Sequence, residues 1–530
     1  MVDCEGVKAG LVIGESSPSV STAIMEPGVQ EAHAGAFVVS RSEEGCVLGM
    51  IESMTAGTHW LPSDPSSPDV VEEILRDMGP GVTHYLRAQI RWISIVEAED
   101  SRVRMRPPRR PVMPGSPVYV APPEILGPIF SPEGVQWLRL GRLLQGEVEY
   151  RVNANMLLRH LAILAVTGGG KSNTVCVLTR RLVRGLNATM VIFDMHGEYG
   201  DLGLGGKAVV HKPAGMNPLA MSFHELLELV RMPPRAINQE RILRWAWKSA
   251  RMLYSHGRIR SHEVMPTVRR LLEELLAANA NASNSRYIRE LLKDEVIDKP
   301  PLAVEKDQVQ GVLNKLDDLD EYYSDVLNPR IDISLESVIQ PGKLTVFDLS
   351  ELDENGADAV ASHYLRRILQ ERKRHKATGG ATGYPVPLLV IVEEAHVLLP
   401  REGEKLSKYW AARIAREGRK FGVGLVLVSQ RPKNVDPDIL SQTNNKIILR
   451  MVEPQDIRYV QQASEELSDD LTGLLPGLSP GEAVVIGSMT RMPALVKIDK
   501  CDVETGGSDI NLVEEWNRVR EPEDLARELF

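Results

Sequence analysis

The stretch Ala165-Val-Thr-Gly-Gly-Gly-Lys-Ser-Asn-Thr174 decides how the rest of the chain is interpreted. It follows an apolar run, 161–166, and opens an amphipathic segment, 171–183, which is the strand–loop–helix context of a phosphate-binding P-loop. Consecutive glycines let backbone N–H groups surround phosphate oxygens. We therefore expect a nucleotide to be bound by Thr167, Gly168, Gly169, Gly170, Lys171, Ser172 and Asn173, with Lys171 at the β- and γ-phosphates and Ser172 on Mg²⁺.

The loop departs from the usual G-x-x-x-x-G-K-[ST] pattern at its first position, where Ala165 replaces a glycine. The alanine adds one methyl group at the end of the strand, and the glycines that surround the phosphates are present. A chance glycine turn is the alternative, and the strand before the loop and the helix after it favour nucleotide binding instead.

A second apolar run, 388–392, ends in two carboxylates, Glu393 and Glu394, followed by Ala395 and His396. A solvated strand edge is the alternative reading of such a pair. Downstream of a P-loop, we expect Glu393 to hold Mg²⁺ and Glu394 to polarise the attacking water. Because adjacent strand residues point to opposite faces, we expect only one of the two to aim at the γ-phosphate.

Two further strand-like runs end in polar residues. The run 190–194 continues as Asp194-Met-His-Gly-Glu-Tyr199, which is either part of the ligand-binding edge of the sheet or a capped turn. The run 424–429 continues into Gln430 and a basic loop. We expect Gln430 to sense the γ-phosphate and to pass its state to that loop, and a simple exit from the strand is the alternative.

Basic residues gather in two kinds of place. A predicted helix end beside the ligand-binding edge carries Arg413, Arg416, Arg419 and Lys420, which either suit the helix dipole or supply an arginine finger to a neighbour, with Arg419 as first choice. Two loops offer DNA-contact candidates, namely Arg401, Lys405 and Lys408 in one and Arg431 and Lys433 in the other. A solvated charged face is the alternative for these loops.

Composition narrows the class of protein. A chain of 530 residues predicts three or four folding units, and a net charge of −10 argues against a protein that coats nucleic acid with its whole surface, so any DNA contact must be local. No secretory signal and no apolar run of membrane-spanning length is visible, so we expect a cytoplasmic protein without a membrane partner. The cysteines, Cys4, Cys46, Cys176 and Cys501, form no CxxC pair, which argues against zinc ribbons and a disulfide framework and favours a reducing compartment.

The pattern of apolar runs predicts an α/β protein with added domains. Short alternating runs between Gly, Pro and Ser clusters predict a β-barrel over 1–125. Strands alternating with helices predict a mostly parallel sheet with helices on both faces over 126–217 and 331–500. Helical periodicity alone predicts an all-helical insertion over 218–330, and 501–530 remains as a tail that packs on a neighbour or forms a local helix.

Taken in order, the motifs resemble the HerA branch of the HerA–FtsK ATPases, the archaeal and bacterial hexameric DNA translocases. The resemblance rests on the P-loop, Asp-Met-His-Gly-Glu-Tyr199, Val392-Glu-Glu-Ala-His, Ile414-Ala-Arg-Glu-Gly-Arg-Lys-Phe-Gly, Ser429-Gln-Arg-Pro and Ser441-Gln-Thr-Asn-Asn-Lys-Ile. It extends over nearly the whole chain, because the family also carries an N-terminal β-barrel like that of the rotary ATP synthases and a helical insertion in its RecA-like core.

The resemblance implies cofactors, roles and partners. It implies ATP and Mg²⁺ bound by Lys171 and Ser172, a Walker B pair of Glu393 and Glu394, Gln430 as the sensor, and Arg419 and Arg159 as arginines that act in trans. It also implies a homo-hexamer on double-stranded DNA that works with the nuclease NurA in DNA end resection for recombinational repair. The tail 501–530 would then brace neighbouring subunits.

Three other readings stay open. A DNA-pumping ATPase of conjugation or segregation would normally add membrane helices or a DNA-reading winged-helix tail. A P-loop small-molecule ligase or kinase would not respond to DNA. A non-catalytic scaffold would use ATP only to hold a ring together, which the expected role of Glu394 opposes.

Overall fold

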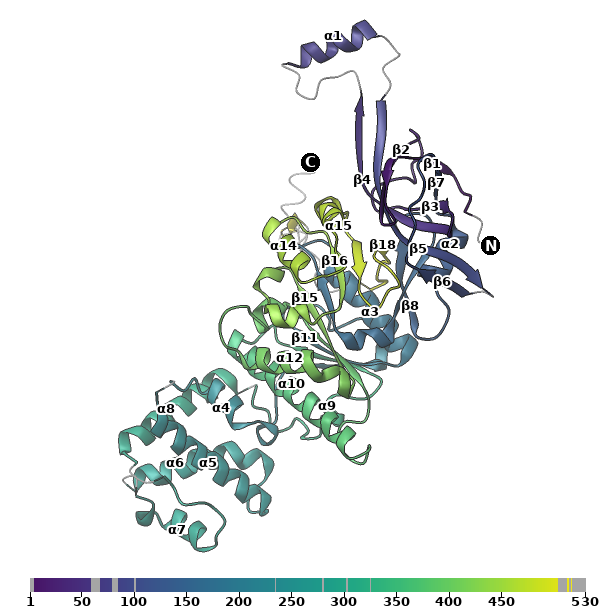
Figure 1. Cartoon of the computed structure of the whole chain (residues 1–530). Coiled ribbons are helices and arrows are strands. Elements are labelled where there is room, and N and C mark those ends of the chain that lie inside the picture. The colour runs from purple at the N-terminus through teal and green to yellow at the C-terminus, as the bar shows by residue number, and fades with distance from the viewer. Residues whose placement is uncertain are drawn as a thin grey trace, which may run out of the picture.

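The structure, a computed structural model, describes residues 4–58, 67–78, 84–99, 102–233, 235–278, 281–301, 304–324, 326–503, 512, 513 and 516. Most of the predicted tail, 501–530, therefore lies outside the described residues. A β-barrel and a helical insertion lie at opposite ends of the molecule, with a large sheet between them (Figure 1). No helix in the described ranges has the length and apolar character that crossing a bilayer requires.

The N-terminal sheet closes on itself. Its strands are β1 (Lys8–Ser16), β2 (Val20–Met25), β3 (Phe37–Ser42), β4 (Gly45–Thr58), β5 (His84–Glu99), β6 (Arg102–Arg106) and β7 (Pro117–Val120). They are ordered β2-β1-β7-β3-β4-β5-β6, and an added pairing between β2 and β5 closes the ring. The inward side chains, such as Val38, Ile51 and Ile90, are fully buried. The long strands β4 and β5 extend beyond the barrel and carry α1 (Pro68–Met78) at their tip (Figure 1).

The second sheet is mostly parallel and has the order β12-β13-β11-β14-β15-β10-β16-β17-β18-β8-β9. Its strands are β8 (Trp137–Leu143), β9 (Glu149–Asn153), β10 (Leu161–Leu164), β11 (Thr189–Asp194), β12 (Ala208–His211), β13 (Leu344–Asp348), β14 (Leu388–Val392), β15 (Val423–Ser429), β16 (Asn445–Leu449), β17 (Glu482–Ile486) and β18 (Ala494–Ile498). Strands β12 to β16 in this order are parallel, and β17, β18, β8 and β9 extend the sheet in antiparallel pairs.

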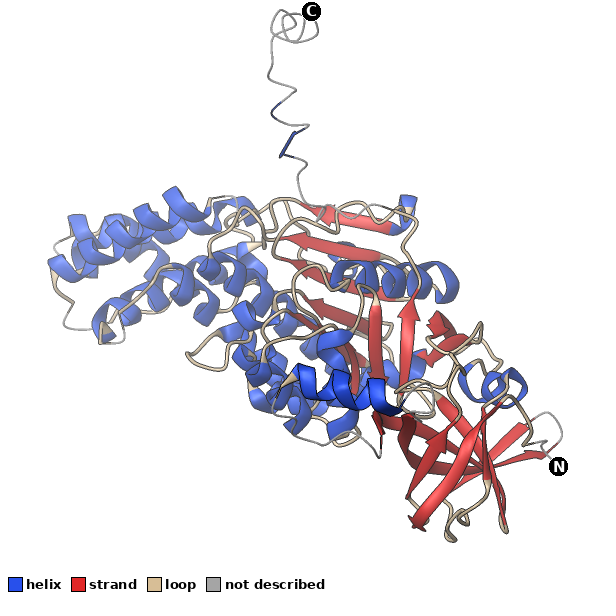
Figure 2. Cartoon of the chain, turned by 90° about the horizontal axis from the view of Figure 1, so that it is seen from above, coloured by secondary structure: helices blue, strands red, loops and turns tan. Residues whose placement is uncertain are grey.

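Helices cover the large sheet on both sides (Figure 2). The helices that follow the barrel, apart from those of the insertion, are α2 (Pro123–Phe130), α3 (Lys171–Leu186), α9 (Leu335–Val338), α10 (Glu354–Ala377), α11 (Ala395–Leu398), α12 (Leu406–Glu417), α13 (Pro437–Ser441), α14 (Pro454–Gln462) and α15 (Asp469–Leu474). Every residue of β10, β11, β13 and β14 is buried, which is why these strands are continuous apolar runs in the sequence. The barrel and the mostly parallel sheet with helices on both sides (Figure 2) confirm the predicted α/β fold class.

Between β12 and β13 the chain forms a group of helices: α4 (Phe223–Leu229), α5 (Ile237–Ser255), α6 (Val264–Ala277), α7 (Arg286–Lys293) and α8 (Lys306–Tyr323). Glu225 of α4 connects this group to α10, because it accepts hydrogen bonds from Arg366 Nε at 2.8 Å and lies 3.2 Å from His363. Burial opposes ionisation of Glu225, but His363 and Arg366 lower its pKa to about 2. Glu225 is therefore ionised, and its bond to the Arg366 guanidinium, with the buried His363 beside it, holds the insertion on the core.

The prediction that the cysteines form no disulfide framework is wrong. The structure contains two disulfides, Cys4–Cys46 and Cys176–Cys501, with Cα–Cα distances of 5.6 and 6.1 Å. The partners are 42 and 325 residues apart in sequence, so the fold, rather than a local CxxC spacing, brings them together. The argument from cysteine spacing to a reducing compartment therefore loses its basis.

Candidate nucleotide-binding site

The predicted P-loop connects β10, near the middle of the large sheet, to α3, which begins at Lys171. Gly168 and Gly170 adopt the left-handed conformation, with φ of 74° and 102°. A Cβ atom at Gly170 would also lie 3.0 Å from the backbone nitrogen of Gly481. Glycine is therefore required here both for conformation and for space.

Four predicted residues form one hydrogen-bonded cluster at the carboxyl ends of β10, β14 and β15. The buried ammonium group of Lys171 donates to Glu394 Oε1. Gln430 Nε2 donates to the same oxygen at 2.8 Å, and Thr167 Oγ1 donates to Gln430 Oε1 at 2.6 Å. The structure thus brings together residues of the P-loop, the predicted Walker B strand and the predicted sensor.

Both predicted Walker B carboxylates approach Lys171, which corrects the expectation that they point to opposite faces. Strand β14 ends at Val392, and Glu394 turns into the left-handed conformation with φ of 44°. Strand alternation therefore no longer applies at this position. Glu393 Oε1 lies 3.8 Å from Lys171 Nζ, and Glu394 Oε1 is the direct partner of that ammonium group.

The two carboxylates have opposite electrostatic environments. Burial raises the pKa of Glu393 to about 8, although Lys171 opposes this shift. Burial also acts on Glu394, but His396, whose Nδ1 lies 3.1 Å from Glu394 Oε2, and Lys171 lower its pKa to about 2. At neutral pH, Glu393 therefore holds a proton and Glu394 is ionised. The buried Glu393 Oε2 has no hydrogen-bond partner among the described residues.

The turn after β11, Asp194-Met-His-Gly-Glu-Tyr199, agrees with both interpretations of its sequence, because it is a capped turn and it also lies beside the P-loop. The buried Asp194 carboxylate caps the turn, because it accepts backbone N–H bonds at 2.8 to 3.2 Å from all four residues 196–199. The capped turn presents Glu198, whose Oε2 accepts a hydrogen bond from Ser172 Oγ at 2.7 Å. Glu198 was not among the predicted site residues, although its place after a strand end beside the P-loop was a signal.

The side chain of Asn173 is turned away from this cluster. Its Nδ2 donates to the Asp499 carbonyl at 2.9 Å, and its Oδ1 accepts from the Cys501 backbone at 2.8 Å. Asn173 thus connects α3 to the segment after β18.

The two arginines expected to act in trans lie at the opposite edge of the sheet. Arg159 ends a 3₁₀ turn (Ala154–Arg159) before β10, and the exposed Arg419 lies in a second one (Gly418–Phe421) before β15. The two turns are in contact. The expectation that the helix end carrying Arg419 lies at the ligand-binding edge is wrong, because α12 returns antiparallel to the strands.

The two loops proposed as alternative DNA contacts lie side by side. Arg401 N donates to the Asn434 carbonyl at 2.7 Å, and Pro400 pairs with Val435. The five candidates, Arg401, Lys405, Lys408, Arg431 and Lys433, therefore share one end of the sheet.

The five candidate DNA-contact residues differ in whether a carboxylate already pairs with their charge. Lys405 pairs with Glu354 at 3.0 Å, Lys408 with Asp436 at 3.2 Å, and Lys433 lies 4.0 Å from Glu453. Within the described ranges, the exposed Arg401 and Arg431 have no carboxylate partner, and the Arg401 guanidinium lies 5.7 Å from the centre of the Tyr459 ring. These two arginines are the most available cations of the pair of loops.

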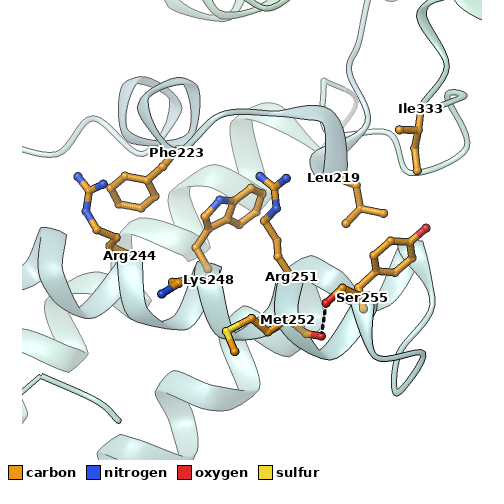
Figure 3. A pocket seen from close by; sticks show the side chains of 10 residues that line it. Leu219, Phe223, Arg244, Lys248, Arg251, Met252, Ser255 and Ile333 are labelled. Atoms are coloured by element: carbon orange, nitrogen blue, oxygen red, sulfur yellow. Dashed lines mark hydrogen bonds between the residues drawn. The ribbon is translucent and has the colours of Figure 1, made fainter. Parts of the chain in front are cut away.

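A large cavity elsewhere shares none of these residues. It has a volume of about 710 Å³ and lies along α5, facing Leu219, Phe223 and Ile333 (Figure 3). The Arg244 guanidinium already covers the Phe223 ring at 4.1 Å, and Lys248 pairs with Asp298. The residues that line this cavity are therefore not part of the candidate nucleotide-binding site.

The chain is similar to a protein family, to named relatives and to solved structures. The family model described as "Helicase HerA, central domain" matches residues 138–368. The DNA double-strand break repair helicase HerA of Sulfurisphaera tokodaii is 39% identical over 516 residues, and that of Sulfolobus acidocaldarius is 38% identical over 517, each alignment covering 97% of both chains. The solved structure of VirB4 of Thermoanaerobacter pseudethanolicus is 15% identical, with a TM-score of 0.47, and the alignment covers 70% of this chain and 98% of that one.

Proposed function

The chain belongs to the HerA helicase family, and on that premise we propose that it is an ATP-driven DNA translocase and helicase that acts in the repair of DNA double-strand breaks. Relatives named as DNA double-strand break repair helicases, aligned over 97% of the chain, support this proposal. The observation that carries it is the bonded series from Lys171 through Glu394 to Gln430, because Gln430 leads directly into the basic loop at Arg431.

The residues of the site fit ATP and Mg²⁺. Gly168 and Gly170 leave the P-loop backbone open to phosphate oxygens, and Lys171 supplies a cation beside them. Ser172 and Glu198 supply a hydroxyl and a carboxylate oxygen of the kind that Mg²⁺ prefers, and Glu393 would add a second carboxylate on losing its proton, since metal ligands must be deprotonated. When bound, Mg²⁺ would neutralise charge on the phosphates. The unpartnered Oε2 of Glu393 is the atom that such a cation would satisfy.

The same contacts suggest how hydrolysis is controlled. A nucleotide phosphate beside the ammonium group of Lys171 would compete with Glu394 for that group and so release the carboxylate. Glu394, ionised at neutral pH, is then free to orient and polarise a water molecule. Gln430 bonds to the same Glu394 oxygen, so a change at Glu394 reaches Gln430 directly.

We propose that Arg401 and Arg431, supported by Lys405, Lys408 and Lys433, contact the phosphates of double-stranded DNA. All five lie at the carboxyl end of the sheet, on the two loops joined by the Arg401–Asn434 bond and on the first turn of α12, which carries Lys408. Their proximity to Gln430 would connect nucleotide state to movement on DNA. In a chain of net charge −10, such binding must be local and should weaken steeply with salt.

Two finer proposals concern assembly. Arg159 and Arg419 lie at the edge opposite their own P-loop, so they can complete a nucleotide site only in a neighbouring copy. This placement supports a ring of identical subunits, for which we propose the hexamer of the family resemblance. From the same resemblance we propose the nuclease NurA as the partner in DNA end resection.

The direct test is the ATPase rate of the full-length protein with and without duplex DNA, at defined salt and with oligomeric state verified by mass. We expect DNA to raise the rate. An ATPase rate that DNA leaves unchanged, with NurA both absent and present, would favour a small-molecule ligase or kinase instead.

A further inference from the structure

A second cationic site lies on the far half of α3, away from the P-loop. It is a pocket of about 500 Å³ between α3, strands β8 and β9, and the segment 500–502. Six basic side chains line it, namely Arg139, Arg151, Arg180, Arg181, Arg184 and Lys500. In a chain of net charge −10, this local excess of positive charge needs an explanation.

Three carboxylates offset only part of this charge. Asp499 accepts from Arg139 Nε at 2.9 Å and also pairs with Arg181. Glu149 accepts from Arg139 at 3.0 Å and from Arg151 at 2.9 Å. Asp502 lies 3.9 Å from Arg180 and is itself 90% exposed. Within the described ranges, cations therefore outnumber their carboxylate partners by two to one.

The uncompensated groups are specific. The side chain of Arg180 is 12% exposed, and its buried Nη1 has no hydrogen-bond partner in the part of the chain that the structure describes. Arg184 donates to the Gly203 carbonyl, and no described carboxylate pairs with it or with Lys500. A buried donor without a partner raises the free energy of the folded protein, and more so when the group is charged. An anion in the pocket would remove that cost.

The walls of the pocket are held in place. The Cys176–Cys501 disulfide and both side-chain bonds of Asn173 fix the segment 499–501 against α3. Arg180 and Arg184 are four residues apart and so lie on one face of the helix. At about 1.5 Å of rise per residue, Arg181 lies roughly 15 Å along α3 from Lys171. This pocket and the P-loop are therefore separate anion sites on one helix.

We propose that this pocket binds a run of adjacent phosphate groups, supplied either by the backbone of a nucleic acid or by a free polyphosphate. Guanidinium groups present N–H donors in the planar geometry that matches phosphate oxygens, and five of the six cations are arginines. The site goes beyond the proposed function, because neither the P-loop nor the basic loops of the carboxyl edge contribute a residue to it.

The test uses calorimetric titration of full-length protein with inorganic tripolyphosphate. Lys171→Ala is present in every sample, which weakens P-loop binding equally throughout. Adding Arg184→Ala and Lys500→Ala together should weaken tripolyphosphate binding at least about tenfold, because each substitution removes a charged hydrogen-bond donor from the pocket. Arg142→Ala is the matched control, because Arg142 lies on β8, pairs with Glu147 and does not line the pocket.

A second variant, Lys500→Glu, reverses one exposed charge and should weaken tripolyphosphate binding more than Lys500→Ala alone does. Thermal melts verify that each variant is folded. A short DNA duplex that displaces tripolyphosphate from the Lys171→Ala protein identifies nucleic acid as the source of the phosphates, and failure to displace identifies a free polyphosphate. Equal affinity of the pocket variants and the Arg142→Ala control, or no tripolyphosphate binding by the Lys171→Ala protein, would overturn the proposal.

Discussion

The ammonium group of Lys171 donates a hydrogen bond to the carboxylate of Glu394, a residue 223 positions later in the chain. The contact joins the predicted phosphate-binding cation to the predicted water-activating base. Each group holds the other in this structure, so neither is free to act until the pair separates. This mutual restraint makes the variants of the pair informative.

Replacing Glu394 by Gln should preserve nucleotide binding and slow hydrolysis by roughly 10²–10⁴-fold, because an amide keeps the shape but is not a base. The ATP affinity and the ATP hydrolysis rate, both measured on this variant, test the two parts of the prediction. Glu371→Gln is a control, because that carboxylate lies on α10, where it pairs with Arg374. If Glu393→Gln instead binds Mg·ATP normally and stalls, while Glu394→Gln turns over, the two roles are reversed.

The buried Glu393 predicts how stability depends on pH. Its pKa is raised from 4.5 to about 8, so between these values the folded state holds a proton that the unfolded state has lost. The free energy of unfolding without nucleotide should therefore fall as pH rises toward about 8, with a contribution of about 1.4 kcal/mol per pH unit from this group. Above about pH 6, Glu394 is ionised in both states and adds no slope.

Denaturant unfolding of wild-type protein and of Glu393→Gln at several pH values measures that contribution. The Gln variant should show a shallower decline over this range. Identical pH profiles for the two proteins would mean that Glu393 is ionised in the folded state.

An arginine that acts in trans predicts recovery of activity by mixing. Lys171→Ala and Arg419→Ala subunits should each hydrolyse ATP poorly alone, since the first lacks the phosphate cation and the second lacks the group for its neighbour. Mixed rings contain interfaces where an intact P-loop meets an intact Arg419, so the mixture should exceed both parents. Arg159→Ala gives the same comparison for the second arginine. A mixture no more active than the average of its parents would assign Arg419 to its own chain or to a helix end.

Much of the fold could be predicted because the central strands are buried on both faces. That burial makes them unbroken apolar runs, and the structure places β10, β11, β14 and β15 where those runs predict strands. Strands β8, β9, β17 and β18, at one side of the sheet, were not predicted. The disulfides were also missed, because Cys176 and Cys501 meet only through the completed fold.

The site was predictable residue by residue but not in its geometry. The type and spacing of Lys171, Glu394 and Gln430 pointed to one site, and the structure brings them together. Glu393 and Glu394 were expected to point to opposite faces of the sheet because side chains alternate along a strand. The left-handed conformation of Glu394 ends that alternation. The placement of Arg419 at the far edge depends on the direction of α12, which a local charge pattern does not contain.

The position of the two basic loops predicts that mutation can remove the response to DNA without removing basal ATP hydrolysis. Replacing Arg401 and Arg431 together by Ala should leave the basal ATPase rate within about twofold, because neither side chain bonds to the Lys171–Glu394 pair, and should flatten the salt dependence of DNA binding. Stimulation by duplex DNA should be lost. Arg286→Ala, in the helical insertion and 88% exposed, is the matched control. Full stimulation of the double variant would remove these loops from the DNA path.

Movement along double-stranded DNA is the central claim, and displacement of a third strand from a DNA triplex measures it directly. The wild-type protein should displace the third strand when ATP and Mg²⁺ are present, and Glu394→Gln should bind the same DNA without displacing it. Displacement that proceeds equally without ATP, or absence of displacement by a wild-type protein that hydrolyses ATP and binds the duplex, would contradict the account.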